Sequence, residues 1–169
     1  MIKKFLIAAS LMFSTAVQAE GDAHNSLGFA AGGTYGVGLS YSYDTPVWGI
    51  QVTGLPFWDD GEGRVFGGVN VKRNFHENGK VGLYGSAGVA GGIWREEHEE
   101  CNWSEQTEED ECETVVEEGW GVVSGPGVGM QMLFWDNMLF RFELPLGIKV
   151  SSEGFGVLPI PNGALMYRW

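Results

Sequence analysis

Apolar residues alternate with polar residues or glycine from "SLGFAAG" to the end of the chain, and no stretch has a helical period. The alternation is clearest in "MLFRFELPLGIKV". There Met138 and every second residue up to Val150 are apolar, and the other parity includes Arg141, Glu143 and Lys149. Successive side chains of a strand point to opposite faces. The sequence therefore predicts an all-β protein whose strands have one wholly apolar face.

Turn signals divide this alternation into eight stretches, at residues 26–32, 34–43, 48–53, 65–75, 80–94, 120–134, 138–150 and 155–169. Pro159 and Pro161 predict a bulge or a shortened strand in the last stretch. A soluble barrel fills its lumen with apolar side chains and turns polar ones to water, which is the reverse of this pattern. The sequence therefore favours a closed eight-stranded antiparallel up-and-down transmembrane β-barrel, because an open edge would leave unpaired backbone groups in lipid.

Residues 1–19 have the pattern of a secretory signal peptide. Lys3 and Lys4 precede an apolar stretch, and small residues precede a cleavage position after Ala19. The expected mature domain, residues 20–169, has 8 basic and 22 acidic residues, a formal net charge of −14. This charge argues against nucleic acid and anionic surfaces as electrostatic partners.

The C-terminal segment "GALMYRW" places Leu165, Tyr167 and Trp169 on one face and ends on an aromatic residue. In length, signal peptide, alternation and ending, the chain resembles the small eight-stranded OmpA/OmpX-like barrels of the Gram-negative outer membrane. The resemblance implies residence in outer-membrane lipid and recognition of the C-terminal strand by the barrel assembly machinery. It also implies that both termini face the periplasm.

Aromatic residues on the apolar parity are expected to form two girdles at the membrane interfaces. One rim would contain Tyr43, Trp48, Phe75, Phe134, Phe140, Tyr167 and Trp169, and the other would contain Tyr35, Trp58, Trp120 and Phe155. Strand parity then places four turns outside the cell: 32–34, 58–64, 95–118 and 151–154. The turns at 44–47, 76–80 and 135–137 would face the periplasm.

The longest of these external turns, Arg95–Glu118, contains 12 of the 22 acidic residues and both cysteines of the chain. Repulsion between like charges predicts an extended loop without a compact fold of its own. Export predicts a disulfide between Cys101 and Cys112 that restrains this loop. A solvated loop with a structural bridge is the simplest interpretation. Divalent-cation binding and recognition of a basic partner, with Trp103 as an anchor, are the alternatives.

Charged residues on the polar parity predict a cluster in the lumen, formed by Lys72, Arg141, Glu143, Lys149 and Arg168. Because buried charges must pair, Glu143 is expected to bind Arg141, Lys72 or Lys149 and so to help plug the barrel. Eight strands leave an interior barely wider than its own side chains. A plugged barrel with a structural or surface-interaction role is therefore favoured over a narrow pore.

The sequence predicts no enzyme and no cofactor. None of the three histidines, His24, His76 and His98, lies on a strand beside a Ser or Asp that could serve as nucleophile or activator. A soluble exported barrel that holds an apolar ligand, as lipocalins do, would explain the signal peptide and the strand number. It would not explain the polar inner parity or the terminal Trp169.

Overall fold

The computed structural model describes residues 23–59, 62–104, 109–152 and 154–169. The predicted signal peptide lies outside these residues, as do the side chains of Trp58 and of residues 96–114. The described residues form nine strands: β1 (His24–Gly32), β2 (Gly36–Asp44), β3 (Trp48–Asp59), β4 (Glu62–Asn78), β5 (Val81–Ser104), β6 (Glu109–Phe134), β7 (Met138–Ser151), β8 (Gly154–Pro159) and β9 (Asn162–Arg168). No helix among them is long and apolar enough to cross a bilayer.

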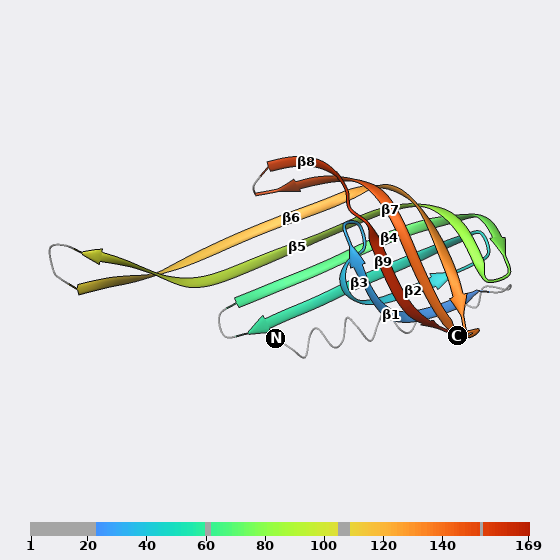
Figure 1. The fold of residues 1–169 in the computed structure, drawn as a ribbon, viewed down its shortest axis with the longest axis horizontal. Coiled ribbons are helices and arrows are strands. Elements are labelled where there is room, and N and C mark those ends of the chain that lie inside the picture. Colours follow the sequence, from blue (N-terminus) through green and yellow to red (C-terminus); the bar gives the residue numbers. More distant parts are fainter. Residues whose placement is uncertain (1–22, 60–61, 105–108, 153) are drawn as a thin grey trace.

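Every pairing is antiparallel and joins neighbours in an up-and-down order, as Figure 1 shows. The sheet closes because β9 pairs with β7 on one side and with β1 on the other, for example at Leu27 opposite Tyr167. The terminal backbones complete this seam, since Asn25 and Trp169 exchange hydrogen bonds of 3.1 and 2.9 Å. The prediction of a closed antiparallel barrel is confirmed.

The strands β8 and β9 are two parts of one eighth strand. β7 pairs Leu146 with Pro159 and Glu143 with Asn162, so the register continues unchanged across the break. Pro159 and Pro161 have no N–H to donate, which interrupts the strand without inserting a bulge. Within the described residues β8 pairs with β7 alone, whereas β9 has partners on both sides.

The strands β5 and β6 extend well beyond the other strands at one end of the barrel, and β3 and β4 end beyond β1 and β2 at the same end (Figure 1). The polar loop expected at residues 58–64 is wrong in its extent, because β3 runs to Asp59 and β4 begins at Glu62. The ladder between these strands continues to the pair Asp59 and Glu62. Backbone hydrogen bonds therefore extend the sheet through residues whose polarity suggested a loop.

The acidic segment also differs from the expectation of an irregular loop. β5 and β6 stay paired along it to Ser104 opposite Glu109, and Cys101 lies directly opposite Cys112. Charge repulsion does favour an extended chain, as predicted. Two extended chains already aligned by the barrel can continue their ladder, so the segment is a long β-hairpin.

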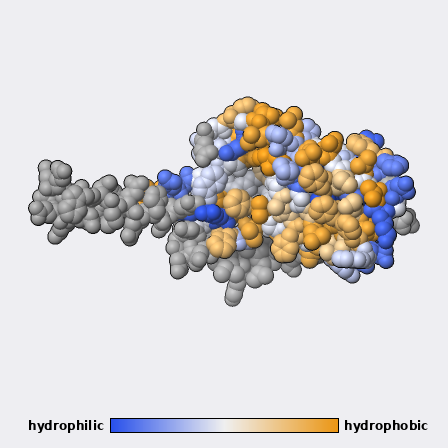
Figure 2. Space-filling view, viewed as in Figure 1, coloured by the Kyte–Doolittle hydropathy of each residue, from blue (hydrophilic) through white to orange (hydrophobic). Residues whose placement is uncertain are grey.

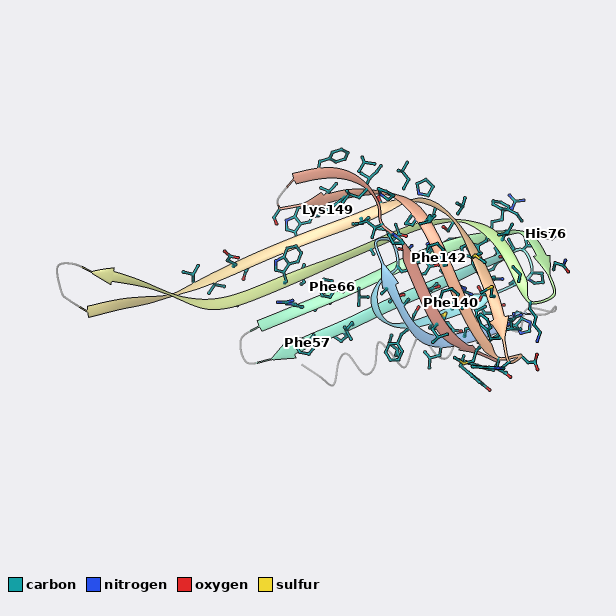
Figure 3. The ribbon with its side chains drawn as sticks, viewed as in Figure 1. Phe57, Phe66, His76, Phe140, Phe142 and Lys149 are labelled. Atoms are coloured by element: carbon teal, nitrogen blue, oxygen red, sulfur yellow. The ribbon has the colours of Figure 1, made fainter. Side chains whose placement is uncertain are left out.

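Side-chain parity divides the barrel into a polar interior and an apolar exterior. Val128 and Leu144, which face each other across β6 and β7, are 65% and 52% exposed. Polar residues of the opposite parity are buried, among them Ser42, Gln51, Asn70 and Gln131. Figure 2 shows hydrophobic residues over much of the barrel flank and hydrophilic ones near its ends. Figure 3 shows Phe140 and Phe142 along β7.

One predicted girdle residue, Tyr35, faces the opposite way. It is only 2% exposed, because it lies in the turn between β1 and β2 rather than in a strand. The next residue, Gly36, has a φ of 74°, in the left-handed region that favours glycine. Strand parity therefore does not apply at Tyr35, and the turn directs its ring inward.

Crowding inside the barrel gives a test of the parity. A Cβ at Gly129 would lie 2.5 Å from Cζ of Tyr84 and 2.8 Å from the Phe142 carbonyl oxygen, whereas one at Gly163 would meet nothing within 4 Å. Gly129→Val should therefore lower the free energy of unfolding by about 1–3 kcal/mol, measured by urea titration in micelles. Gly163→Val is the matched control. Equal effects of the two changes would contradict the assigned interior.

Candidate functional site

The interior holds two neighbouring polar clusters, each built around one buried carboxylate. The first is centred on Asp44, the last residue of β2, which is 9% exposed. Its Oδ1 lies 3.0 Å from Nζ of Lys72, and its Oδ2 accepts hydrogen bonds from Nη2 of Arg141 and from the Ser42 hydroxyl, the latter at 3.0 Å. A single carboxylate thus compensates two buried cations from opposite walls of the barrel.

Neutral side chains also bind these two cations. Lys72 donates to Oε1 of Gln131 at 2.6 Å, and its Nζ lies 5.3 Å from the centroid of the Tyr84 ring. Arg141 donates to Oε1 of Gln51 at 2.8 Å. Buried charges are tolerated where opposite charges and hydrogen bonds surround them. The first cluster pairs both charged groups in this way, although Nε of Arg141 and Nε2 of Gln51 are buried without a hydrogen-bond partner among the residues that the structure describes.

The second cluster surrounds Glu143, which is 1% exposed. Its Oε1 accepts hydrogen bonds from the amides of Asn162 at 3.0 Å and Asn70 at 3.5 Å, and its Oε2 accepts one from Tyr35 at 3.1 Å. The hydroxyls of Tyr35 and Tyr84 lie 3.0 Å apart. The predicted pairing of Glu143 with a base is therefore wrong, because neutral donors surround it while Arg141 and Lys72 pair with Asp44.

The predicted lumen cluster is only partly assembled. Lys72, Arg141 and Glu143 are buried at the barrel's middle, as their parity predicted. Arg168 lines a cavity of 310 Å³ beside the turn at residues 45–47, together with His24, Asp44 and Asn74. Lys149 lies farther along β7, near β8 (Figure 3). Parity thus predicted which side chains face inward, but it carries no information on their depth.

Sequence reasoning missed Asp44 by assigning it to a turn. A signal for its role was present, because Gly36, Gly38, Ser40 and Ser42 occupy one parity of β2 and Asp44 continues it. The strand extends one residue farther than expected, and this carries the carboxylate into the lumen. The central charges then balance, with Asp44 and Glu143 against Lys72 and Arg141.

The turn between β1 and β2 reaches into the lumen from the end with the long strands. Thr34 is fully buried, and its N–H donates to Oδ1 of Asn162 at 3.2 Å while its hydroxyl accepts from Nδ2 at 2.7 Å. A Cβ at Gly68 would collide with the Tyr35 carbonyl oxygen, and one at Gly88 would lie 3.1 Å from that of Thr34. The turn is therefore fixed between β9 on one side and β4 and β5 on the other.

The residues of the C-terminal motif face outward. Leu165, Tyr167 and Trp169 are 52%, 53% and 53% exposed, and the last two rings stack with centroids 6.4 Å apart. Trp169 follows β9, which forms the closing seam with β1. The motif is therefore an exposed aromatic edge at the point where the barrel closes.

Groups of three or more metal-ligating side chains are absent from the described part of the chain. His24 lies in β1 and lines the cavity near Arg168, and His76 lies in β4 rather than in a turn. The side chain of His98 lies outside the described residues.

The fold is similar to those of solved β-barrels. The N-terminal β-barrel domain of Pseudomonas aeruginosa OprF shares 13% sequence identity with a TM-score of 0.48, covering 87% of this chain and 96% of that one. Ail, the attachment invasion locus protein of Yersinia pestis, shares 18% identity with a TM-score of 0.41, covering 89% and 100%. A second structure is that of the Yersinia pestis outer membrane protein Ail in a phospholipid bilayer nanodisc. It shares 17% identity with a TM-score of 0.41, covering 89% of this chain and 100% of that one. No family model and no curated protein matches the sequence.

Removing the carboxylate of Asp44 tests the first cluster. Asp44→Ala would leave Lys72 and Arg141 buried without their counter-charge, and should lower the free energy of unfolding by about 3–5 kcal/mol in urea titration. Lys80→Ala, which breaks the exposed pair with Asp136 at 3.2 Å, is the control and should change it by less than about 1 kcal/mol. A loss for Asp44→Ala no larger than that of the control would contradict the proposed role of the carboxylate.

Proposed function

We propose that the protein is an integral β-barrel of a Gram-negative outer membrane, with a plugged polar lumen and an acidic hairpin that projects from the cell surface. The observation that carries this proposal is the combination of a closed barrel with apolar side chains on its exposed face. Val128, Leu146 and Phe155 are 65%, 57% and 73% exposed. So much apolar surface is costly in water and suits hydrocarbon.

The polar interior supports the same proposal over a soluble lipocalin-like barrel. A soluble barrel needs apolar side chains inside, yet Arg141, Glu143 and Asn162 are among the most deeply buried residues here. An apolar ligand would meet these charges and amides instead of an apolar cavity. The lumen is therefore unsuited to the ligands that a lipocalin-like function requires.

The lumen supports a structural plug over a narrow pore. The Asp44 cluster joins side chains of β2, β3, β4, β6 and β7, so it crosses the interior from wall to wall. Opening a path through it would separate ion pairs that lie away from water, which is costly. We therefore propose a structural or surface-interaction role, and ion conduction is the second candidate.

The projecting hairpin is the part best placed to meet partners. Cys101 and Cys112 are opposite one another in the β5–β6 ladder, and Cα atoms of such pairs lie about 4.5–5.5 Å apart, within the range that a disulfide spans. We propose that they form a disulfide that clamps the hairpin near its tip. The dense acidic charge suits a divalent cation or a basic partner, and the solvated hairpin remains the simplest interpretation.

Arginine on the outer face tests insertion. Leu144→Arg should reduce the amount of protein that resists carbonate extraction from the membrane fraction, since arginine at the lipid midplane of a barrel costs about 2–4 kcal/mol. Leu144→Ala at the same position is the control, because it keeps an apolar residue. Wild-type levels of carbonate-resistant Leu144→Arg would argue against lipid contact at this face.

Thiol labelling tests the hairpin. In intact cells, a membrane-impermeant thiol reagent should label Cys101 and Cys112 only after reduction. The Cys101→Ser/Cys112→Ser variant should still insert, because the barrel closes through β1 and β9, far from this tip. Labelling that requires a permeabilised outer membrane would reverse the proposed topology, and labelling without reductant would exclude the disulfide.

A further inference from the structure

The turn between β1 and β2, residues 33–35, is a segment of backbone placed inside the barrel. We propose that this turn closes the lumen at the end with the long strands, so that it, and not only the charged side chains, keeps solutes out of the interior. This inference rests on the proposed function, because it specifies which segment plugs the lumen. It is nevertheless testable without a membrane.

The contacts of the turn span the barrel. On one side Asn162 of β9 holds Thr34 by two hydrogen bonds, of 3.2 and 2.7 Å. On the other side Gly68 and Gly88 leave room for the carbonyl groups of Tyr35 and Thr34, where any Cβ would collide with them or press against them. Thr34 and Tyr35 are only 0% and 2% exposed, so both residues of the turn are packed on all sides by the barrel interior.

The groups beneath the turn are those of the Glu143 cluster. Tyr35 joins the turn to this cluster through hydrogen bonds to Glu143 and Tyr84, at 3.1 and 3.0 Å. Ser86 belongs to the same region, because a Cβ at Gly127 would lie 2.9 Å from both Oγ of Ser86 and Oε1 of Glu143. Without the turn, a polar chamber with a carboxylate at its wall would open to this end. Such a chamber favours cationic or hydroxylated solutes over anions.

At the opposite end of the barrel, the Asp44 cluster closes the lumen instead of a turn. The cavity of 310 Å³ beside the turn at residues 45–47 is lined by Asn74, Arg168 and Asp44. The Asp44 cluster separates this cavity from the Glu143 cluster. The turn therefore controls access from one end only, and a residue in the cavity at the other end should be unaffected by it.

Cysteine accessibility tests this assignment in the purified protein in micelles, in a Cys101→Ser/Cys112→Ser background. Ser86→Cys should react slowly with a cationic methanethiosulfonate reagent while the turn is intact. Replacing the turn side chains, Thr34→Gly/Tyr35→Gly, should raise the rate by at least about tenfold, because a buried group reacts only when its surroundings open. The cationic reagent should then react faster than an anionic one of similar size.

Two controls define the outcome. Trp135→Gly/Asp136→Gly alters the exposed turn at the other end, where both residues have positive φ, and should leave the Ser86→Cys rate unchanged. Asn74→Cys, in the opposite cavity, should react with the reagent at the same rate whether or not the turn residues Thr34 and Tyr35 are replaced. If Thr34→Gly/Tyr35→Gly fails to fold, Asn162→Ala removes the anchor on β9 and should give the same acceleration.

Fast labelling of Ser86→Cys with the turn intact would overturn the proposal, as would an unchanged rate in the folded turn variants. Carbonate extraction tests membrane residence separately, so neither labelling result would bear on it. Loss of carbonate resistance in the wild-type protein would instead remove the membrane proposal and leave the role of the turn standing.

Discussion

The hydrogen-bonded seam between β1 and β9 is the constraint on which the rest of the structure depends. It joins the two ends of the described chain, from Ser26 opposite Arg168 to Ala31 opposite Gly163. With the seam formed, alternate side chains of every strand must face either a closed lumen or the surroundings. A sequence with apolar residues on one parity and glycine, hydroxyl, amide and charged residues on the other can satisfy this division only if its polar groups bind each other inside.

The two buried carboxylates meet this requirement in different ways. Asp44 lies between two cations, so its charge is balanced directly. Glu143 accepts hydrogen bonds from two amides and a phenol, which disperse its charge without neutralising it. Removing a partner from the first centre leaves a buried charge without a counter-charge, whereas removing one from the second leaves a buried hydrogen-bond acceptor without a donor. The interior is therefore held together by one centre of paired charges and one centre in which neutral donors bind a carboxylate.

The alternation of residue types was sufficient to predict the architecture. The inward direction of Lys72, Arg141 and Glu143 followed from parity, and so did the outward direction of Val128 and Leu144. Parity failed for Tyr35, because a turn does not preserve the alternation of a strand. It could not identify the partners of Glu143 either, since these depend on how far each strand is shifted along its neighbour. Polarity also misplaced the ends of β3 to β6, because a ladder already formed can continue through acidic residues.

The turn inside the lumen has a consequence for the order of folding. Thr34 and Asn162 are separated by 128 positions in the chain, whereas β1 and β2 form a local hairpin. Local hairpins form early, and contacts between distant segments form late because closing long loops costs entropy. We therefore expect the β1–β2 hairpin to form before β9 joins, and the hydrogen bonds of Thr34 to Asn162 to form together with the seam. The last strand to join both seals the wall and fastens the turn, so the final folding step completes the barrel and its interior together.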